Sequence, residues 1–202
     1  MEVVVYLETE NGNFKKSALE VSSYGRKLAD ETKTNLCGIA FNSADPFKIQ
    51  KYGVEKLINI KTDHVFDAKI YADLLCKNFK DLGGTIFITG SSADSRFIFP
   101  IVSISLNASY ATNVIEFPSS ISPLILKRSA FTNKGFVFTE LKSNHKIIGI
   151  LNNSYGIFEN VRKLEVKDYI AESIDSNVQI ESIKEDGEKI SIADAEIVVT
   201  GG

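Results

Sequence analysis

Val3-Val4-Val5-Tyr6-Leu7 is a short, unbroken run of apolar and mostly β-branched residues near the start of the chain. Such a run is typical of a parallel strand that is covered on both faces. Similar runs follow at 36–41, 56–60 and 85–89, and segments with helical spacing of apolar residues separate them. Strands that alternate with helices in this way predict an α/β fold built on a parallel sheet.

Helix signals occupy the gaps between these runs. Ser17-Ala-Leu-Glu20 matches a capping box, in which the serine hydroxyl accepts a backbone N–H and the glutamate reaches back to the helix start. A short helical stretch is predicted at 46–52. Asp67 is suited to be the N-cap of a longer helix that ends at Gly83-Gly84.

A turn rich in small polar residues, Gly90-Ser-Ser-Ala-Asp-Ser95, leads from the strand at 85–89 into a third helix. Ser92 or Asp94 is suited to be the N-cap of this helix. Pro100 lies inside it and predicts a kink or a short first turn. Three apolar residues recur at helical spacing and are expected to line its buried face: Phe97, Ile101 and Ile104.

The second half of the chain is rich in strands. We expect strands at 112–117, 124–128, 135–139 and 146–151, and a further hairpin over 178–192. Turn residues between them indicate an antiparallel extension of the parallel sheet. The predicted fold class is a three-layer α/β fold, with a mostly parallel, Rossmann-like sheet and an antiparallel strand extension in the second half.

The composition is that of a globular protein. The chain has 202 residues, of which 44% are hydrophobic and 24% charged, and its net charge is −3. A mildly acidic chain has no general attraction for nucleic acid. No apolar run is long enough for a transmembrane helix, and the first residues have neither signal-peptide nor transit-peptide character. We therefore expect a cytoplasmic protein without membrane insertion.

The cysteines and histidines do not indicate a disulfide, a catalytic site or a zinc site. Cys37 and Cys76 each lie in an apolar run and are expected to be packed thiols rather than a disulfide. His64 and His145 are far apart and have no nucleophile near them in sequence, which argues against catalysis and against a Cys/His zinc site. A metal site made of carboxylates stays open. No catalytic sequence motif occurs, so no catalytic, metal or cofactor-binding residue is assigned.

The loop at 90–95 is the sharpest local feature, because it follows a strand and opens a helix. Its N–H groups could hold an anion. It loosely resembles the Ser-Gly-Gly-x-Asp-Ser pyrophosphate loop of ATP pyrophosphatases, although Ser91 and Ala93 stand in place of that loop's glycines. The simpler interpretation, which we favour, is a capped strand-to-helix turn without a ligand.

The last residues, Ile197-Val-Val-Thr-Gly-Gly202, form an apolar run followed by two glycines. Glycines directly after a strand are typical of the start of a nucleotide-binding unit. We therefore predict a single α/β domain over residues 1–196, and we interpret 197–202 as a strand that begins a further domain, cut short here.

The order of short segments along the first half also resembles that of a known family. Asn11-Gly12 and the helix start at Ser17-Ala-Leu-Glu20 follow the first strand. Tyr52-Gly53-Val54-Glu55-Lys56 then leads into the third strand, similar to a small-Gly-Val-x-Lys step. The strand end at 88–93 precedes a helix with Phe99-Pro100-Ile101, where the family has Leu-Pro-Arg-x-Ala. The family is that of the N-terminal domain of the electron transfer flavoprotein α subunit.

The resemblance continues to the end of the chain. Thr112-Asn113-Val114 stands where the family has Asp-Val, with Asn in place of Asp. Lys127-Arg128-Ser-Ala130, followed by 135–139, is similar to the family's Arg-x-x-Tyr/Ala-Gly-Asn segment. The closest match is Ala193-Asp-Ala-Glu196 with the residues after it. In the family, this strand runs into a Gly-Arg-Gly turn that opens the FAD-binding domain.

This resemblance implies an electron-transfer subunit rather than an enzyme. In the family, the α and β subunits form a heterodimer that carries electrons from acyl-CoA dehydrogenases of fatty acid β-oxidation, and from other dehydrogenases, to a membrane quinone oxidoreductase. The family binds FAD mainly through the C-terminal domain, beyond Gly202. We therefore expect no cofactor in residues 1–202, and a β subunit as the direct partner.

Two other functions stay open at this stage. The chain is alternatively an independent adenine-nucleotide-binding domain that uses the 90–95 loop. It is otherwise a hydrolase whose catalytic residues are brought together only by the fold. A scaffold domain that normally docks other domains exposes apolar surface when it is alone, so we also expect self-association of this chain.

Overall fold

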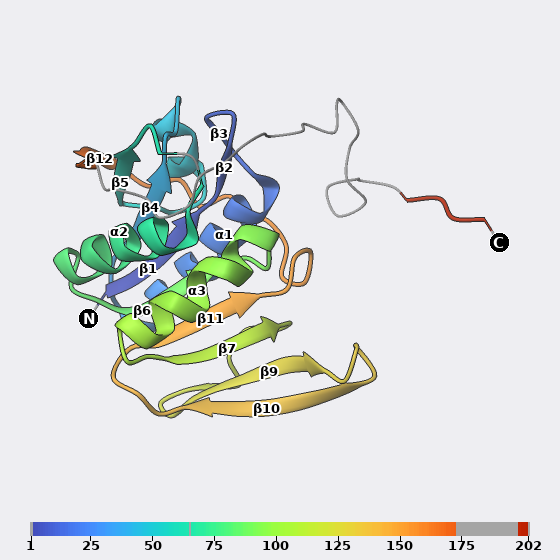
Figure 1. Ribbon diagram of the computed structural model, residues 1–202. Coiled ribbons are helices and arrows are strands. Elements are labelled where there is room, and N and C mark those ends of the chain that lie inside the picture. The colour runs from blue at the N-terminus through green and yellow to red at the C-terminus, as the bar shows by residue number, and fades with distance from the viewer. Residues whose placement is uncertain (1, 65, 173–197, 202) are drawn as a thin grey trace.

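The computed structural model describes residues 2–64, 66–172 and 198–201 (Figure 1). One sheet of ten strands runs through this part of the chain, in the order β10-β9-β7-β11-β6-β1-β4-β5-β12, with β8 paired to β9. The hairpin predicted over 178–192 lies outside the described residues.

The centre of the sheet is parallel. Every neighbouring pair from β7 to β12 along this order is parallel. The strands are β1 (Glu2–Leu7), β4 (Leu36–Phe41), β5 (Lys56–Lys61), β6 (Gly84–Thr89), β7 (Ser109–Val114), β11 (Lys146–Ile150) and β12 (Glu165–Ile170). The predicted α/β fold with a mostly parallel sheet is confirmed.

The antiparallel part is smaller than predicted. It comprises β8 (Ser120–Ile121), β9 (Leu124–Ala130) and β10 (Gly135–Leu141), which continue the sheet from β7. The strand predicted at 146–151 is parallel instead, because β11 inserts between β6 and β7. The strand predicted at 112–117 begins earlier, since Ser109 already pairs with Lys146 of β11. A separate two-stranded sheet, β2 (Thr9–Glu10) and β3 (Asn13–Phe14), surrounds the turn at Asn11-Gly12.

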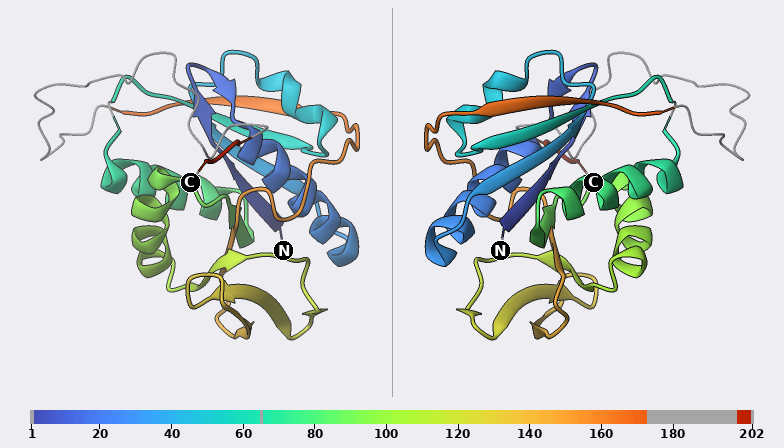
Figure 2. Two further views of the ribbon diagram at one scale, coloured as in Figure 1. Left: turned by 90° about the vertical axis from the view of Figure 1, so that its right-hand side faces the viewer. Right: turned by 90° about the vertical axis from the view of Figure 1, so that its left-hand side faces the viewer.

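Helices cover both faces of the sheet. They are α1 (Lys16–Thr32), α2 (Ala68–Asp81) and α3 (Ala93–Ser105), with a short 3-10 helix, η1 (Pro46–Lys51). Figure 2 shows α1 on one side of the sheet and α2 with α3 on the other. The chain from 151 to 164 passes over α1 and leads to β12, as the hydrogen bond from the Phe158 amide to Ser23 Oγ shows (2.9 Å). The predicted three layers are therefore present.

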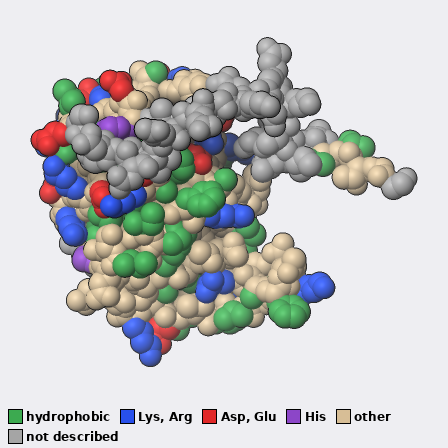
Figure 3. Space-filling model, in the orientation of Figure 1, with side chains coloured by type: hydrophobic (Ala, Val, Ile, Leu, Met, Phe, Trp, Pro, Cys, Tyr) green, Lys and Arg blue, Asp and Glu red, His purple; other side chains and the backbone are tan. Residues whose placement is uncertain are grey.

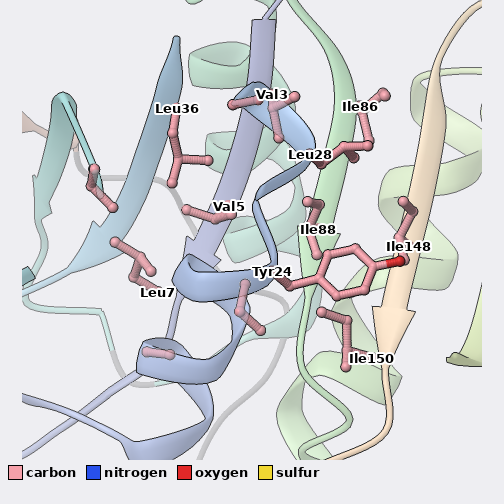
Figure 4. Close-up of a cluster of buried hydrophobic side chains, with 14 of the residues drawn as sticks. Val3, Val5, Leu7, Tyr24, Leu28, Leu36, Ile86, Ile88, Ile148 and Ile150 are labelled. Carbon is pink, nitrogen blue, oxygen red and sulfur yellow. The ribbon is translucent and has the colours of Figure 1, made fainter. Parts of the chain in front are cut away.

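Alternate residues of β1 pack into two hydrophobic cores, one on each face of the sheet. Val3, Val5 and Leu7 face α1 and pack with a cluster that includes Tyr24 and Leu28 (Figure 4). Val4 and Tyr6 face α2 and α3, and pack with Phe79, Phe87 and Phe99 among others. Because successive side chains of a strand point to opposite faces, the unbroken apolar run at 3–7 requires cover on both sides.

Gly25 lets α1 approach the sheet closely. A methyl group at this position would lie 2.7 Å from Val5 Cγ1 and 2.8 Å from Leu36 Cδ1. Both distances are below van der Waals contact, so a larger residue would push the helix away from β1 and β4. The glycine therefore sets the thickness of this layer.

The capping box predicted at Ser17 is wrong. Helix α1 begins at Lys16, its N-cap is Lys15, and no side chain caps it. The Lys15 amide donates to the Glu8 carbonyl (2.9 Å), which fixes the helix start directly after the β2–β3 hairpin. The Ser17 Cβ instead lies about 3.4 Å from where a side chain at Gly90 would begin. Asp67, in contrast, is the N-cap of α2 as predicted, since it accepts from the amides of Lys69 and Ile70.

The predicted buried face of α3 is also wrong at two of its three residues. Phe97 and Ile104 are 65% and 82% exposed, whereas Ile98, Phe99 and Val102 are buried. The helix carries apolar residues all round, and spacing alone does not decide which of two apolar stripes meets the sheet. The helix continues through Pro100 to Ser105. Of the stripe expected to be buried, Ile101 is partly buried against the core, whereas Phe97 and Ile104 form an exposed apolar surface.

The residues predicted as a terminal strand do not form one in their described part. Residues 198–201 have no regular secondary structure, and Val199 is 91% exposed. A strand needs a neighbour that takes up its backbone hydrogen bonds, and residues 198–201 have none among the described strands.

Contrary to the prediction, Glu20 does not cap the start of α1 but binds backbone amides of the segment after β11. Its side chain is buried, and its Oε1 accepts from the amides of Tyr155 (2.7 Å) and Gly156 (3.0 Å). Its Oε2 accepts from the amide of Asn153 (2.8 Å). Three backbone donors after β11 therefore depend on one carboxylate of α1, which fixes where the chain leaves the sheet.

We predict that Glu20→Ala lowers the free energy of unfolding by roughly 3 kcal/mol, because buried N–H groups without a partner cost about 1–3 kcal/mol each and some regain water. Urea unfolding followed by circular dichroism measures the change. Glu31→Ala, an exposed glutamate on the same helix, is the control and should change stability by less than about 0.5 kcal/mol. Equal losses in both variants would contradict the role of Glu20.

Candidate functional site

Ligands of open α/β sheets bind at the carboxyl ends of the parallel strands. In this chain, the carboxyl ends of β1 and β6 meet the N-termini of α1 and α3 at that edge. The 90–95 loop lies there, and so does the segment after β11, because β11 pairs with β6. This edge is therefore the place to look for a nucleotide or cofactor site.

Several polar groups of the 90–95 loop are hydrogen-bonded within the chain. The Ser91 amide donates to Asn152 Oδ1 (3.1 Å), and the Ser91 hydroxyl donates to the Ile150 carbonyl (2.6 Å). The Ser95 amide donates to Ser92 Oγ (3.0 Å), which makes Ser92 the N-cap of α3. The cap predicted for this turn is confirmed: of the two candidates, Ser92 and not Asp94 is the N-cap of α3.

Carboxylates add negative charge beside the loop. Glu8 follows β1 directly, is buried, and forms an ion pair with Lys15 (2.7 Å). Lys15 also lies 3.7 Å from Glu10. Burial raises the pKa of the Asp94 carboxyl above its ordinary value, and the charges of Glu8 and Glu10 raise it further, while Lys15 lowers it. The Lys15 ammonium is thus already shared between two acidic groups.

Lys15 is held firmly as a cation. Burial alone would lower the pKa of its ammonium, but the hydrogen bond to Glu8 and the charges of Glu8, Glu10 and Asp94 outweigh this and raise it. An incoming phosphate would have to displace Glu8 from this ammonium. It would also meet the repulsion of the remaining carboxylates, so the edge disfavours an anionic nucleotide.

Aromatic rings pack beside these carboxylates. The rings of Phe41 and Tyr71 stack with centroids 4.1 Å apart, and Tyr6 packs edge-on against Phe41. Burial raises the pKa of the Tyr6 hydroxyl well above its ordinary value, and Glu8 raises it further. Burial likewise raises the pKa of Tyr71, with Asp94 adding to it. Both phenols therefore stay protonated at neutral pH, and neither can act as a base.

The cysteines and histidines give no reactive centre. Cys37 and Cys76 are free and buried, as predicted, and burial raises the pKa of each thiol to about 11. The His145 ring packs edge-on against Phe79, and its Nδ1 lies 3.0 Å from the Leu106 carbonyl. The His64 amide donates to Thr62 Oγ1 (3.2 Å). The two histidines lie in separate places and share no partner in these contacts.

Away from this edge, the described residues contain no cluster of metal ligands but several hollows. No group of three or more His, Cys, Asp or Glu residues there could hold a metal ion. A cavity of about 240 Å³ lies between the end of α2 and strands β5 and β12. Two larger and more open hollows have volumes of about 430 Å³, beside His145, and about 580 Å³, between the end of α1 and strands β8 to β10. The cavity of 240 Å³ is lined by two lysines and two acidic residues among others: Lys56, Lys167, Asp81 and Glu165.

The sequence analysis did not predict the side-chain contacts at the carboxyl edge of the sheet. Asn152 and Ser91 are 61 residues apart, and no local signal links them. The ion pair between Glu8 and Lys15 was missed, although an acidic residue directly after a buried strand is a usable signal, since it places a carboxylate at the ligand-binding edge.

The fold is an α/β domain with helices on both faces of a mostly parallel sheet, and side chains of the chain itself bind polar groups at the carboxyl edge of its parallel strands. A family model described as "Electron transfer flavoprotein domain" matches residues 3–173. The chain therefore belongs to the electron transfer flavoprotein domain family. Membership of this family indicates an electron-transfer protein rather than an enzyme.

Comparisons with curated proteins and with solved structures do not define the family further. No curated protein matches the chain. Among solved structures, the chain is similar to one described as "Crystal structure of universal stress protein in complex with cAMP", with 14% identity and a TM-score of 0.34. The match covers 50% of this chain and 87% of that one. None of the helices in the described residues is long and apolar enough to cross a membrane.

We predict that Ser92→Ala lowers the free energy of unfolding by about 1 kcal/mol, the usual effect of losing an N-cap. Asp94→Asn is the matched comparison and should leave stability unchanged or raise it at pH 7. A carboxyl whose pKa is raised on folding is penalised when charged, and the penalty disappears as the pH falls through its folded pKa. The advantage of Asp94→Asn should therefore fade in acid, which thermal unfolding at several pH values will measure. A large loss in Asp94→Asn at pH 7 would show that Asp94 supports the helix.

Proposed function

We propose that this chain is the N-terminal domain of an electron transfer flavoprotein α subunit. It serves as a scaffold in a heterodimer that carries electrons from acyl-CoA and other dehydrogenases to a quinone oxidoreductase, and it works in the cytoplasm. The family match over residues 3–173 supports the electron-transfer part of this proposal. The resemblance of the segment at 193–202 to the α-subunit strand before the flavin-binding domain supports the choice of subunit.

The occupied ligand edge is the observation that carries the scaffold role. Asn152 takes the Ser91 amide, and Glu8 takes the Lys15 ammonium. A domain that held its own nucleotide would instead keep such donors available for phosphate. We infer that FAD in the whole protein is bound mainly by a C-terminal domain. The domain described here would then support that C-terminal domain and provide contact surface for the partner subunit.

One further motif of the family resemblance has a clear structural use. Gly53 has a positive φ of 91°, and the stem of Arg26 lies directly against it. Arg26 Nη1 donates to the Gly53 carbonyl (3.2 Å) and to Glu55 Oε2 (2.8 Å). Burial tends to raise the pKa of Glu55, but the hydrogen bonds from Arg26 and from the Leu36 amide lower it overall. The Tyr52–Lys56 step thus ties α1 to the third parallel strand, which is a structural role and fits a scaffold.

The apolar stripe on α3 supports a docking role. Phe97 and Ile104 lie about two helical turns apart, and Pro100 between them is also exposed. Figure 3 shows hydrophobic side chains gathered on this face of the molecule. Exposed apolar patches usually mark surfaces that another protein covers. We propose that this stripe meets the β subunit or the flavin-binding domain.

We predict that this chain binds the cognate β subunit, and that Phe97→Asp/Ile104→Asp weakens the binding at least tenfold, since burying two charged groups opposes docking. Isothermal titration calorimetry measures the affinity. Val161→Asp is the control, because Val161 is also exposed but lies on the segment that passes over α1. The chain alone should show no flavin absorbance after purification with added FAD.

Two results would contradict the proposal. Stoichiometric FAD bound to this chain alone would place the cofactor in this domain. Failure to bind a β subunit, together with binding to an α-type subunit, would assign the chain to the β side of the heterodimer.

A further inference from the structure

One side of strands β9 and β10 is not covered by any helix among the described residues. On the side of the sheet that α1 covers, Leu124 and Leu126 of β9 and Leu141 of β10 are buried in the core. The core on the other side, under α2 and α3, contains no residue of β9 or β10. Figure 1 shows α3 in front of the sheet and no helix in front of these two strands. The helix layer on this side therefore stops at α3.

Two phenylalanines point to the uncovered side. Leu141 points to the α1 side, and side chains alternate along a strand, so Phe136 and Phe138 point the other way. They are 62% and 63% exposed. Lys127 lies opposite Phe138 in the strand pair, and its ammonium is 4.8 Å from the centre of the Phe136 ring. We refer to Phe136, Phe138 and Lys127 as the open face.

Two arginines lie at the boundary between α3 and the open face. Tyr110 of β7, the strand next to β9, packs against Phe99 of α3 with ring centroids 6.3 Å apart. Burial raises the pKa of the Tyr110 hydroxyl to about 12, while the charges of Arg96 and Arg128 lower it. Both guanidinium groups therefore lie near this ring, one from α3 and one from β9.

Neither arginine has an acidic partner among the described residues. The other two arginines of the chain each form an ion pair with Asp30. Arg128 instead donates to the carbonyl (2.6 Å) and the hydroxyl (2.9 Å) of Thr112, and Arg96 is exposed. The chain as a whole has a net charge of −3, so two unpaired arginines beside exposed aromatic rings stand apart from the rest of it. Arginine and aromatic residues are the types that are enriched where proteins bind one another.

We propose that an acidic amphipathic helix of the partner subunit packs on the open face beside α3. Its apolar side meets Phe136 and Phe138, and its carboxylates meet Arg96 and Arg128. A helix fits this place, because helices cover the rest of this side of the sheet, whereas a strand would add to an edge and not to a face. Carboxylates match the unpaired arginines, since charge-assisted hydrogen bonds between these groups are strong and directional. The inference rests on the proposed function, which supplies a β subunit as partner, and adds the chemistry of the contact.

Isothermal titration calorimetry of this chain with the cognate β subunit tests the role of charge. Arg96→Glu should weaken binding on the order of tenfold, because it places like charges together. Arg96→Lys keeps the charge and should stay within about threefold of the unchanged chain. Binding of the unchanged chain should weaken as NaCl rises from about 50 to 500 mM, and binding of Arg96→Glu should depend less on salt. Arg96 supports no ion pair in the described part of the fold, so thermal unfolding should show that both variants fold normally.

A second variant tests the apolar contact. Phe136→Ser/Phe138→Ser should also weaken binding on the order of tenfold, since aromatic anchors carry much of the binding energy of an interface. Lys51→Glu is the matched control for Arg96→Glu and should leave the affinity unchanged. It makes the same change in net charge at an exposed lysine on η1, whose buried Ile49 packs in the core on the α1 side of the sheet.

A zero-length carbodiimide cross-linker detects the carboxylates directly, because it joins an amine to a carboxylate that touches it. In the complex of Arg96→Lys, we expect an amide bond between the new amine and an Asp or Glu of the β subunit, identified by mass spectrometry. A guanidinium does not couple in this way, so the unchanged chain should give no cross-link from position 96.

The outcomes separate this inference from the proposed function. Binding that responds neither to Arg96→Glu nor to salt would overturn the inference and leave the proposed function standing, and so would equal losses in Arg96→Glu and Lys51→Glu. A complex that Phe97→Asp/Ile104→Asp disrupts and Phe136→Ser/Phe138→Ser does not would also overturn it, because the partner would then meet α3 alone. Failure of the unchanged chain to bind the β subunit would contradict the proposed function itself, and this inference with it.

Discussion

Complete burial of the first strand on both faces is the constraint on which the rest of this structure depends. Residues 3–7 are at most 5% exposed, with odd positions packed under α1 and even positions under α2 and α3. Both faces of β1 must therefore be covered by helices, and the chain must return across the sheet between successive parallel strands. These crossovers bring the carboxyl ends of β1 and β6 to one edge, together with the N-termini of α1 and α3.

What occupies that edge decides what the domain can do. Helix N-termini attract anions, but here Glu8 engages Lys15, and Asn152 engages the 90–95 loop. Glu20 adds a further internal contact by holding the chain just after β11. These side chains form hydrogen bonds and ion pairs with polar groups at this edge, and the contacts stabilise the fold. The exposed apolar side chains of α3 and β10 are then the main surfaces left for contacts with other proteins, which supports the scaffold role proposed above.

The fold was predictable from local patterns, since the unbroken apolar runs, the helix stop at Gly83 and the N-cap at Asp67 are all encoded within a few residues. The errors arise where the decisive partner is distant in sequence. Helix α3 has two apolar stripes, and only its packing against the sheet decides that Phe97 stays outside. Glu20 has the spacing of a capping box, but its partners are amides more than 130 residues away. The occupied ligand edge was likewise invisible, because a loop of the same composition could serve either a ligand or the chain.

The central claim is that the carboxyl edge of the sheet is closed by the chain's own side chains. Nuclear magnetic resonance tests it most directly, through the amide signals of Ser91, Ser92 and Asp94 during titration with AMP, ATP and FAD. The account predicts that these signals do not move at millimolar ligand, while the amides of an unrelated surface such as β12 show the same absence of change. Saturable shifts confined to the 90–95 loop would contradict it and show that the edge holds a nucleotide.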